Sequence, residues 1–249
     1  MAAPVYVLIG ATGGIGAALS RRLAADGARL VLGARGAERL RELAAETGAA
    51  AFTLDATQYP AVQSLVRSAA ETHGRVDGVV NLVGSILLKP AHLLSPQEFE
   101  ETLRVNLSTA FHALKAGVDA MRQNRDPQGG AVVLMASVAA RLGLANHEAI
   151  AAAKAGVMGL VAAGAASYAS RGIRVNALAP GLVRTPLAGR LVASEEAEQA
   201  SAKMHALGRI GEPEDLVDAI AFLLDPARSG WMTGETLSID GGFAHVRPR

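Results

Sequence analysis

Short apolar runs alternate with helical stretches along almost the whole chain, and no other feature constrains the fold as much. Most of these runs are continuously apolar, which is typical of strands whose two faces are both covered. The predicted strands are residues 5–9, 29–34, 50–54, 78–83, 131–136, 174–179 and 236–239. The predicted helices between them lie near residues 14–26, 36–47, 58–73, 95–123, 147–169 and 213–224.

The repeated strand–helix–strand order predicts an α/β fold: a doubly wound, Rossmann-type parallel sheet of about seven strands with helices on both faces. The 249 residues suit a single domain, and half of them are hydrophobic. The sequence Ser-Pro-Gln-Glu at 95–98 marks a helix start, and Gly27 and Gly48 stand where helices should end. Residues 181–212 are the least regular stretch, and such long segments in compact domains are usually functional.

Composition excludes several classes of function. The net charge is +1 with both signs scattered, so we expect no nucleic-acid partner. The absence of cysteine excludes disulfides and thiolate catalysis, and the six histidines lack metal-ligand spacing, so we expect no metal. Neither a signal peptide nor an uncharged apolar run of about 18 residues is recognisable, so we expect no membrane association and a cytoplasmic location.

A glycine-rich loop directly follows the first predicted strand and opens the first predicted helix. It consists of Gly10, Ala11, Thr12, Gly13, Gly14, Ile15 and Gly16. Glycines allow a tight turn and a close approach of the backbone to a pyrophosphate, while the helix N-terminus offers N–H groups and a positive dipole end. The loop therefore predicts a dinucleotide site, and the alternative is a flexible strand–helix turn without a ligand.

The spacing Gly10-x3-Gly14-Ile15-Gly16 resembles the cofactor loop of the short-chain dehydrogenase/reductase family, and further motifs follow in the family's order. They are Asp55 with Ala56, Asn81-Leu82-Val83-Gly84, Asn106, Ser137, Lys154, and Asn176-x3-Pro180-Gly181-x3-Thr185, which includes Val183. The C-terminal segments 211–215, 233–234 and 240–242 look like those of 3-oxoacyl-(acyl-carrier-protein) reductases. The resemblance covers nearly the whole chain.

The resemblance implies which residues hold the cofactor. Asp55 would lie at the adenine, and the stretch from Pro180 to Thr185 would hold the nicotinamide end. Each residue alone has a plainer interpretation: Asp55 as a turn residue, Asn106 as a buried hydrogen-bonding residue at a kink, and Thr185 as a helix cap. Residues 240–242 are better explained as a turn and subunit contact than as chemistry.

The end of the second predicted strand bears on the choice of cofactor. NAD-binding sites place an acid there to bind the ribose 2′-hydroxyl, but this chain has Ala34 followed by Arg35. A guanidinium can bind a 2′-phosphate, which an acid would repel. Arg35 therefore favours NADP(H). NAD(H) stays possible, because Arg35 could also be a solvated residue at a strand end.

The family's catalytic pattern, Ser-x12-Tyr-x3-Lys, is incomplete. The resemblance implies that Ser137 polarises a carbonyl, that Lys154 holds the nicotinamide ribose, and that Asn106 supports a proton relay. Counting from Ser137 and counting back from Lys154 both place the tyrosine at Ile150, which has no proton to exchange. Tyr168 follows Lys154 by 14 residues, roughly 21 Å along a helix.

The other two tyrosines are no better placed. Tyr6 begins the first strand, at the end of the sheet opposite to the ligands, and Tyr59 has no suitable spacing. His147 precedes Ile150 by three residues, on the same helix face, so we hypothesise that it replaces the tyrosine as proton donor, directly or through water. The helix N-terminus would favour the neutral ring, which can act as a hydrogen-bond donor to the carbonyl. The alternative is a partly exposed loop histidine.

Two functions follow from these features. One is an NADP(H)-dependent carbonyl reductase or alcohol dehydrogenase with an unusual acid–base group, and the other is a non-catalytic dinucleotide-binding or regulatory protein. Residues 182–208 would form a lid over the substrate, and their Ala, Leu and Val content fits a small or medium apolar carbonyl compound or alcohol. The small residues of 147–169, with helix 95–123, resemble the family's dimer helices and predict a homotetramer or homodimer.

Overall fold

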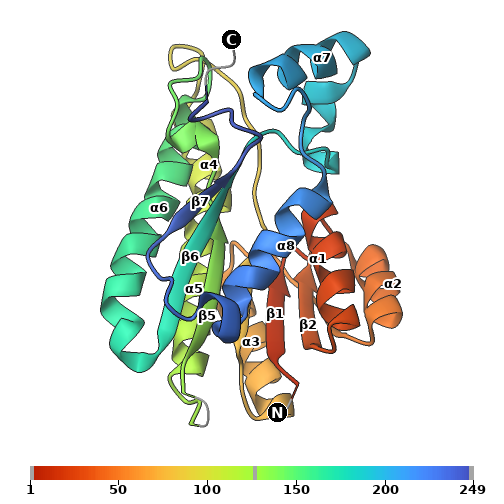
Figure 1. The fold of residues 1–249 in the computed structure, drawn as a ribbon, viewed down its shortest axis with the longest axis vertical. Coiled ribbons are helices and arrows are strands. Elements are labelled where there is room, and N and C mark those ends of the chain that lie inside the picture. Colours follow the sequence, from red (N-terminus) through yellow and green to blue (C-terminus); the bar gives the residue numbers. More distant parts are fainter. Residues whose placement is uncertain (1–2, 126–127, 247–249) are drawn as a thin grey trace.

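The computed structural model describes residues 3–125 and 128–246. Seven parallel strands form one sheet in the order β3-β2-β1-β4-β5-β6-β7, with helices on both faces (Figure 1). The strands are β1 (Val5–Ile9), β2 (Arg29–Ala34), β3 (Ala50–Thr53), β4 (Gly78–Asn81), β5 (Gly130–Met135), β6 (Ile173–Pro180) and β7 (Thr236–Ile239). The predicted doubly wound α/β fold is confirmed.

The helices that follow the strands match the predicted ones within a few residues in most cases. They are α1 (Gly14–Ala25), α2 (Ala37–Thr47), α3 (Tyr59–His73), α4 (Pro96–Leu103), α5 (Thr109–Met121), α6 (Glu148–Tyr168), α7 (Glu195–Met204), α8 (Pro213–Leu224) and the short α9 (Pro226–Ser229). The predicted start at residue 95 is confirmed, because Ser95 and Glu98 form a reciprocal capping box. Gly48 ends α2 in the left-handed conformation, as expected for a C-cap.

Two predicted elements are wrong in detail. Residues 95–123 are not one α-helix, because a π-helical turn, Arg104–Ser108, separates α4 from α5. The stretch 181–212 is not wholly irregular: it contains the 3-10 segment Pro186–Val192 and helix α7. No residue of α7 is buried, so the sequence there lacks the apolar periodicity by which a packed helix is recognised.

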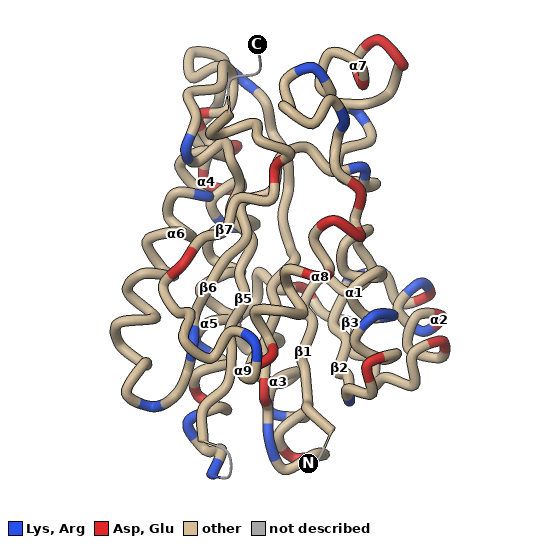
Figure 2. Tube along the Cα trace, in the orientation of Figure 1, with Lys and Arg blue, Asp and Glu red and all other residues tan. Residues whose placement is uncertain are grey.

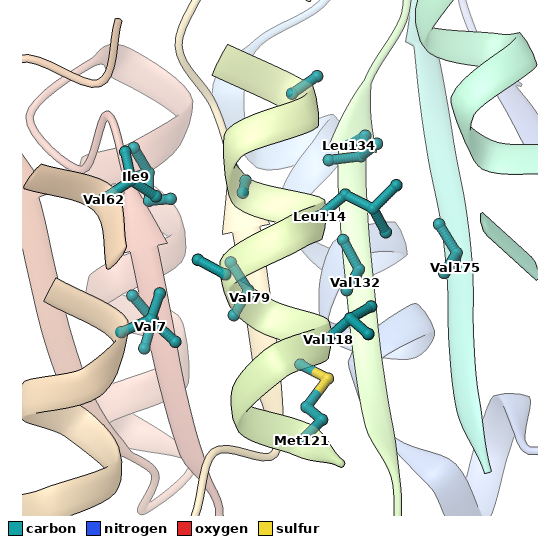
Figure 3. Packing of buried hydrophobic residues seen from close by; sticks show 14 of the residues in the cluster. Val7, Ile9, Val62, Val79, Leu114, Val118, Met121, Val132, Leu134 and Val175 are labelled. Carbon is teal, nitrogen blue, oxygen red and sulfur yellow. The ribbon is translucent and has the colours of Figure 1, made fainter. Parts of the chain in front are cut away.

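The sheet separates two apolar layers. Alternate residues of β1 point to opposite sides, so that Val7 packs with α3 and α5, whereas Leu8 packs with α1 and α8. Figure 3 shows the first layer, where Leu114, Val118 and Met121 of α5 lie against strands β4 and β5. Burial of both sheet faces explains why the strands are continuously apolar.

Charged residues of both signs are interspersed over the outer helices and loops, and Figure 2 shows no element that gathers basic residues into a stripe. Helix α6 is apolar and long enough to span a membrane by composition alone. Its residues Ala153, Val157 and Val161 are nevertheless fully buried in the protein core. We therefore regard α6 as a core helix.

Candidate active site

The glycine loop is shaped by close backbone contacts. Gly10 has a φ of +85° and donates its N–H to the carbonyl of Gly33, the neighbouring strand residue, at 2.8 Å. A β-carbon on Gly16 would lie 2.5 Å from the Gly10 carbonyl oxygen, so no larger residue fits. Gly13 caps α1 without a side-chain hydrogen bond, which leaves the first N–H groups of the helix for an anion.

A cavity of about 400 Å³ opens beside this loop at the carboxyl end of the sheet, and we call it the cofactor cavity. The strand order reverses between β1 and β4 at this point, which is where doubly wound folds bind ligands. The cavity brings together most of the predicted cofactor residues. They are Gly10, Thr12, Gly13, Gly14, Ile15, Gly16, Arg35, Asp55, Ala56, Gly84 and Thr185.

Five other predicted cofactor residues do not line this cavity, and one of them is Lys154, which lies behind Gly84. Asn81 is buried and donates from its amide nitrogen to the Thr109 hydroxyl at 3.2 Å, so it ties β4 to α5. Pro180 ends β6. Gly181 and Val183 line a smaller cavity of about 140 Å³ behind the lid instead.

Arginines surround the outer end of the cofactor cavity. Arg35 and Arg39 both line it, next to the buried wall residue Ala34. On the opposite side, the Asp55 carboxylate accepts hydrogen bonds from the backbone N–H and the hydroxyl of Thr57, at 2.9 and 2.8 Å. These two hydrogen bonds, with weaker attraction from Arg104 and Arg35, hold the pKa of Asp55 below its usual value.

Arg104 joins the adenine-side loop to the π-helical turn. Its guanidinium forms a two-pronged ion pair with Glu101, at 2.6 and 2.8 Å, and also donates to the Thr57 hydroxyl. Arg39, Thr57 and Arg104 were not predicted as site residues. Arg39 could have been suspected, because it lies one helical turn after Arg35, but no sequence signal points to Arg104.

The inner end of the site contains a buried polar cluster. The Asn106 amide accepts from the backbone N–H of Ser85 at 3.1 Å and donates to the Ser85 hydroxyl at 2.9 Å and to the Thr102 carbonyl at 3.1 Å. A β-carbon on Gly84 would lie 3.1 Å from the Asn106 side-chain oxygen and 3.6 Å from Lys154 Nζ. Gly84 thus brings the wall of the cofactor cavity close to both side chains.

Lys154 is buried and has no carboxylate nearby. Its Nζ donates to the Met135 carbonyl at 2.8 Å, and burial alone lowers the pKa of its ammonium to about 8. Ile150, one turn earlier on α6, is 5% exposed. Ile150 is therefore a packed aliphatic side chain one turn before Lys154.

Ser137 and His147 lie in the segments that lead to α6. Ser137 follows β5 in extended conformation, and its hydroxyl accepts from the Ala139 N–H at 3.2 Å. His147 is the residue immediately before α6, half-buried, and its Nδ1 lies 2.7 Å from the Ala145 carbonyl oxygen. Neither residue lines the cofactor cavity.

Residues 184–198 border the cofactor cavity and are tied by ion pairs to the start of α8. Thr185, Pro186 and Leu187 line the cavity, while α7 stands at the carboxyl end of the sheet (Figure 1). Arg184 pairs with Glu198 of α7 and with Glu212 at the start of α8, at 2.5 and 2.9 Å. These ion pairs join the segment beside the cavity to α7 and to the start of α8.

Comparisons with known proteins agree with this geometry. Residues 10–244 match the family model described as enoyl-(acyl carrier protein) reductase. The chain is 37% identical to cis-4-hydroxycyclohexanecarboxylate dehydrogenase of Sinomonas cyclohexanicum, over 97% of each chain. It is 31% identical to 3-oxoacyl-(acyl-carrier-protein) reductase of Vibrio cholerae, over 96% of each. The crystal structure of levodione reductase superposes with a TM-score of 0.91, at 29% identity, over 98% of each chain.

Relatives of this kind use NAD(P)(H), and the site fits such a cofactor. The Gly16 contact leaves room for backbone alone, and the first N–H groups of α1 have no side-chain cap. The cavity continues from there to Gly84, behind which the Lys154 amine lies. The match to the family model runs from the glycine loop to beyond the C-terminal strand β7, and the fold matches that of solved relatives over nearly the whole chain. The chain belongs to the short-chain dehydrogenase/reductase family and is an oxidoreductase that acts on CH–OH and C=O groups.

Proposed function

We propose that the protein is an NADP(H)-dependent reductase or dehydrogenase that exchanges the substrate proton through a group other than tyrosine. The observation that carries this proposal is the buried Lys154 amine behind Gly84 of the cavity wall, where the Asn106 side chain also lies. A buried ammonium without a carboxylate is costly, and such groups cluster at functional sites. Its retention beside Ile150 favours a working site over a disabled one.

The roles of the remaining residues follow from their chemistry. The nicotinamide cofactor supplies or accepts hydride. Lys154 holds the nicotinamide ribose, Asn106 supports the surrounding backbone, and the Ser137 hydroxyl donates to the substrate oxygen. His147 exchanges the proton with that oxygen, directly or through a water molecule. Asn81, Pro180, Gly181 and Val183 would support the nicotinamide end from outside the cavity.

The cofactor preference rests on Arg35. Its guanidinium lines the cavity beside Ala34, where an acid would select NAD(H), and no ion pair within residues 3–125 and 128–246 occupies it. Arg39 lines the same end of the cavity and adds a second positive charge. A 2′-phosphate would be attracted to both, so NADP(H) is favoured, while NAD(H) can still bind through the rest of the site.

The substrate is a small or medium carbonyl compound or alcohol under the lid, residues 182–208. Three relatives are named as dehydrogenases of ring alcohols: cyclohexanol, cis-4-hydroxycyclohexanecarboxylate and a 3beta-hydroxysteroid. Another is named as a dehydrogenase of D-threitol, which is a polyol. Leu187 of the lid lines the cavity, which favours an apolar substrate. We further propose that residues 1–249 form one cytoplasmic domain that assembles as a homodimer or homotetramer.

The test is turnover by the purified protein with NADPH and NADH against ketones, 3-oxoacyl thioesters and, in the reverse direction, alcohols. We expect NADPH to be consumed with at least one ketone, and the loss of its nicotinamide absorbance measures the rate. The matched control is Lys154→Met, which should bind the cofactor weakly and turn over nothing. Tight NADPH binding without turnover of any substrate would instead support a non-catalytic, cofactor-binding protein.

A further inference from the structure

The backbone that leads into α6 has an unusual conformation. Asn146 has a φ of +64°, and it is the only non-glycine residue with a positive φ in the described ranges 3–125 and 128–246. The left-handed region is unfavourable for residues with a β-carbon, although asparagine tolerates it better than most. Such a conformation persists only where the surrounding structure enforces it.

The segment 89–91 supplies that enforcement. The Asn146 carbonyl accepts a hydrogen bond from the Lys89 N–H at 2.8 Å. The Glu148 carboxylate accepts one from the Ala91 N–H at 3.1 Å. His147 lies between these two anchors, so its backbone is held from both sides.

The same turn decides which ring nitrogen of His147 holds a proton. Nδ1 lies 2.7 Å from the Ala145 carbonyl oxygen, and a carbonyl oxygen can only accept a hydrogen bond. Nδ1 must therefore be the protonated nitrogen. In the neutral ring Nε2 then has a free lone pair and no hydrogen, so it cannot act as the hydrogen-bond donor that the sequence left open.

We propose that Asn146 is a positioning residue, whose left-handed backbone holds the Ala145 carbonyl against His147 Nδ1 and thereby makes Nε2 the proton-exchanging atom. This inference rests on the proposed role of His147. In alcohol oxidation the neutral Nε2 takes the hydroxyl proton while hydride leaves the carbinol carbon for the nicotinamide, and the C=O bond forms. In the reverse direction only the imidazolium can return the proton. With a neutral His147 ring the enzyme can therefore catalyse alcohol oxidation but not the reverse reaction.

The tautomer can be measured without any turnover. Long-range ¹H–¹⁵N correlation spectra distinguish the two tautomers of a histidine, and His147→Ala identifies the His147 signals. We expect the Nδ1–H form for neutral His147. His92 is the matched control, because it is exposed and no polar contact is found for it in the described part of the chain. It should show the Nε2–H form that an unconstrained histidine side chain prefers. The Nε2–H form at His147 would overturn the inference.

Two substitutions test the part played by Asn146. Glycine adopts positive φ readily, so Asn146→Gly should keep the Nδ1–H form and stay within about threefold of the parent kcat for alcohol oxidation. Asn146→Val should lose that form and reduce kcat at least about tenfold, with KM nearly unchanged, because a misplaced general base loses much of its effect. An unchanged tautomer in Asn146→Val would refute the positioning role.

The two proposals fail in different ways. If the tautomer behaves as expected but His147→Ala leaves turnover unchanged, the positioning by Asn146 stands and the catalytic role of His147 is wrong. If His147→Ala abolishes turnover but neutral His147 is the Nε2–H form, the catalytic role stands and the present inference is wrong. The spectrum of the unsubstituted protein is decisive even if Asn146→Val does not fold.

Discussion

The side-chain methyl group of Thr185 lies 2.9 Å from the point at which a β-carbon on Gly14 would stand. The lid therefore touches the glycine loop where the loop turns into α1, although the two residues are 171 positions apart in the sequence. Glycine is required here for two different reasons. Gly14 makes room for a side chain that can move, whereas Gly16 makes room for backbone that cannot.

Substitution of these two glycines should therefore have unequal effects. Gly14→Ala should displace Thr185 by a few tenths of an ångström, with a loss below about 1 kcal/mol in the free energy of unfolding. Gly16→Ala would press against the Gly10 and Ala11 carbonyls, and we expect a loss of about 2–3 kcal/mol together with loss of NADPH binding. Urea unfolding and cofactor fluorescence measure the two effects. Normal NADPH affinity in Gly16→Ala would contradict this account.

Arg35→Ala should weaken NADPH binding and spare NADH. A charge-assisted hydrogen bond is worth roughly 1.5–3 kcal/mol, which corresponds to about 10- to 150-fold in affinity. The matched control is Arg41→Ala, which removes an exposed arginine of α2 that does not line the cavity. Titration of each variant with both cofactors gives the answer. Equal affinities of the unsubstituted protein for NADPH and NADH would exclude the proposed binding of the 2′-phosphate by Arg35.

Much of this architecture could be predicted because its signals are local. Buried parallel strands are apolar throughout, and the glycine loop needs its glycines within a few residues of β1. The π-helical turn has no such local signal, and the polar contacts of its Asn106 are made with Ser85, 21 residues away. Arg104, the first residue of that turn, lines the cofactor cavity, and the positive φ of Asn146 beside His147 likewise has no local sequence signal.

Removal of the buried charge at Lys154 should stabilise the cofactor-free protein. Burial lowers the pKa of the ammonium from 10.5 to about 8, so below pH 8 the folded state bears a penalty of roughly 3 kcal/mol. Met135 would lose its hydrogen-bond donor, which offsets about 1 kcal/mol. At pH 7 we therefore expect the free energy of unfolding of Lys154→Met to exceed that of the unsubstituted protein by about 2 kcal/mol.

The pH dependence of this difference provides the control. Between pH 8 and 10.5 the folded protein releases the Lys154 proton before the unfolded chain does, so the stability of the unsubstituted protein rises relative to the variant. The advantage of Lys154→Met should shrink across that window, as measured by denaturant unfolding at several pH values. A variant less stable than its parent at pH 7 would show that the amine is better solvated than its burial implies.

His147→Ala should lower turnover by about 10²–10⁴, the usual contribution of a positioned acid or base. NADPH affinity should hardly change, because His147 lies outside the cofactor cavity. A loss of less than about threefold would remove His147 from the mechanism. In that case a gain of carbonyl reduction in Ile150→Tyr would identify a disabled site whose Ser137 and Lys154 are still correctly placed.

The chain should associate in solution. Small exposed residues along α6, among them Gly159, Ala162 and Ala163, would allow another helix to approach closely, and Phe111 of α5 is 47% exposed. We expect multi-angle light scattering at micromolar concentration to give the mass of a dimer or a tetramer. The mass of a single chain, 25.5 kDa, would count against assembly.

The π-helical turn Arg104–Ser108 acts like one residue inserted into an otherwise regular helix. Each residue of an α-helix advances by about 100°, so the faces of α4 and α5 are out of phase by roughly that angle. Deletion of a single residue in this turn would restore a regular helix and rotate α4 about its axis relative to the sheet. The site should consequently not tolerate shortening there, even by a residue whose own side chain makes no contact.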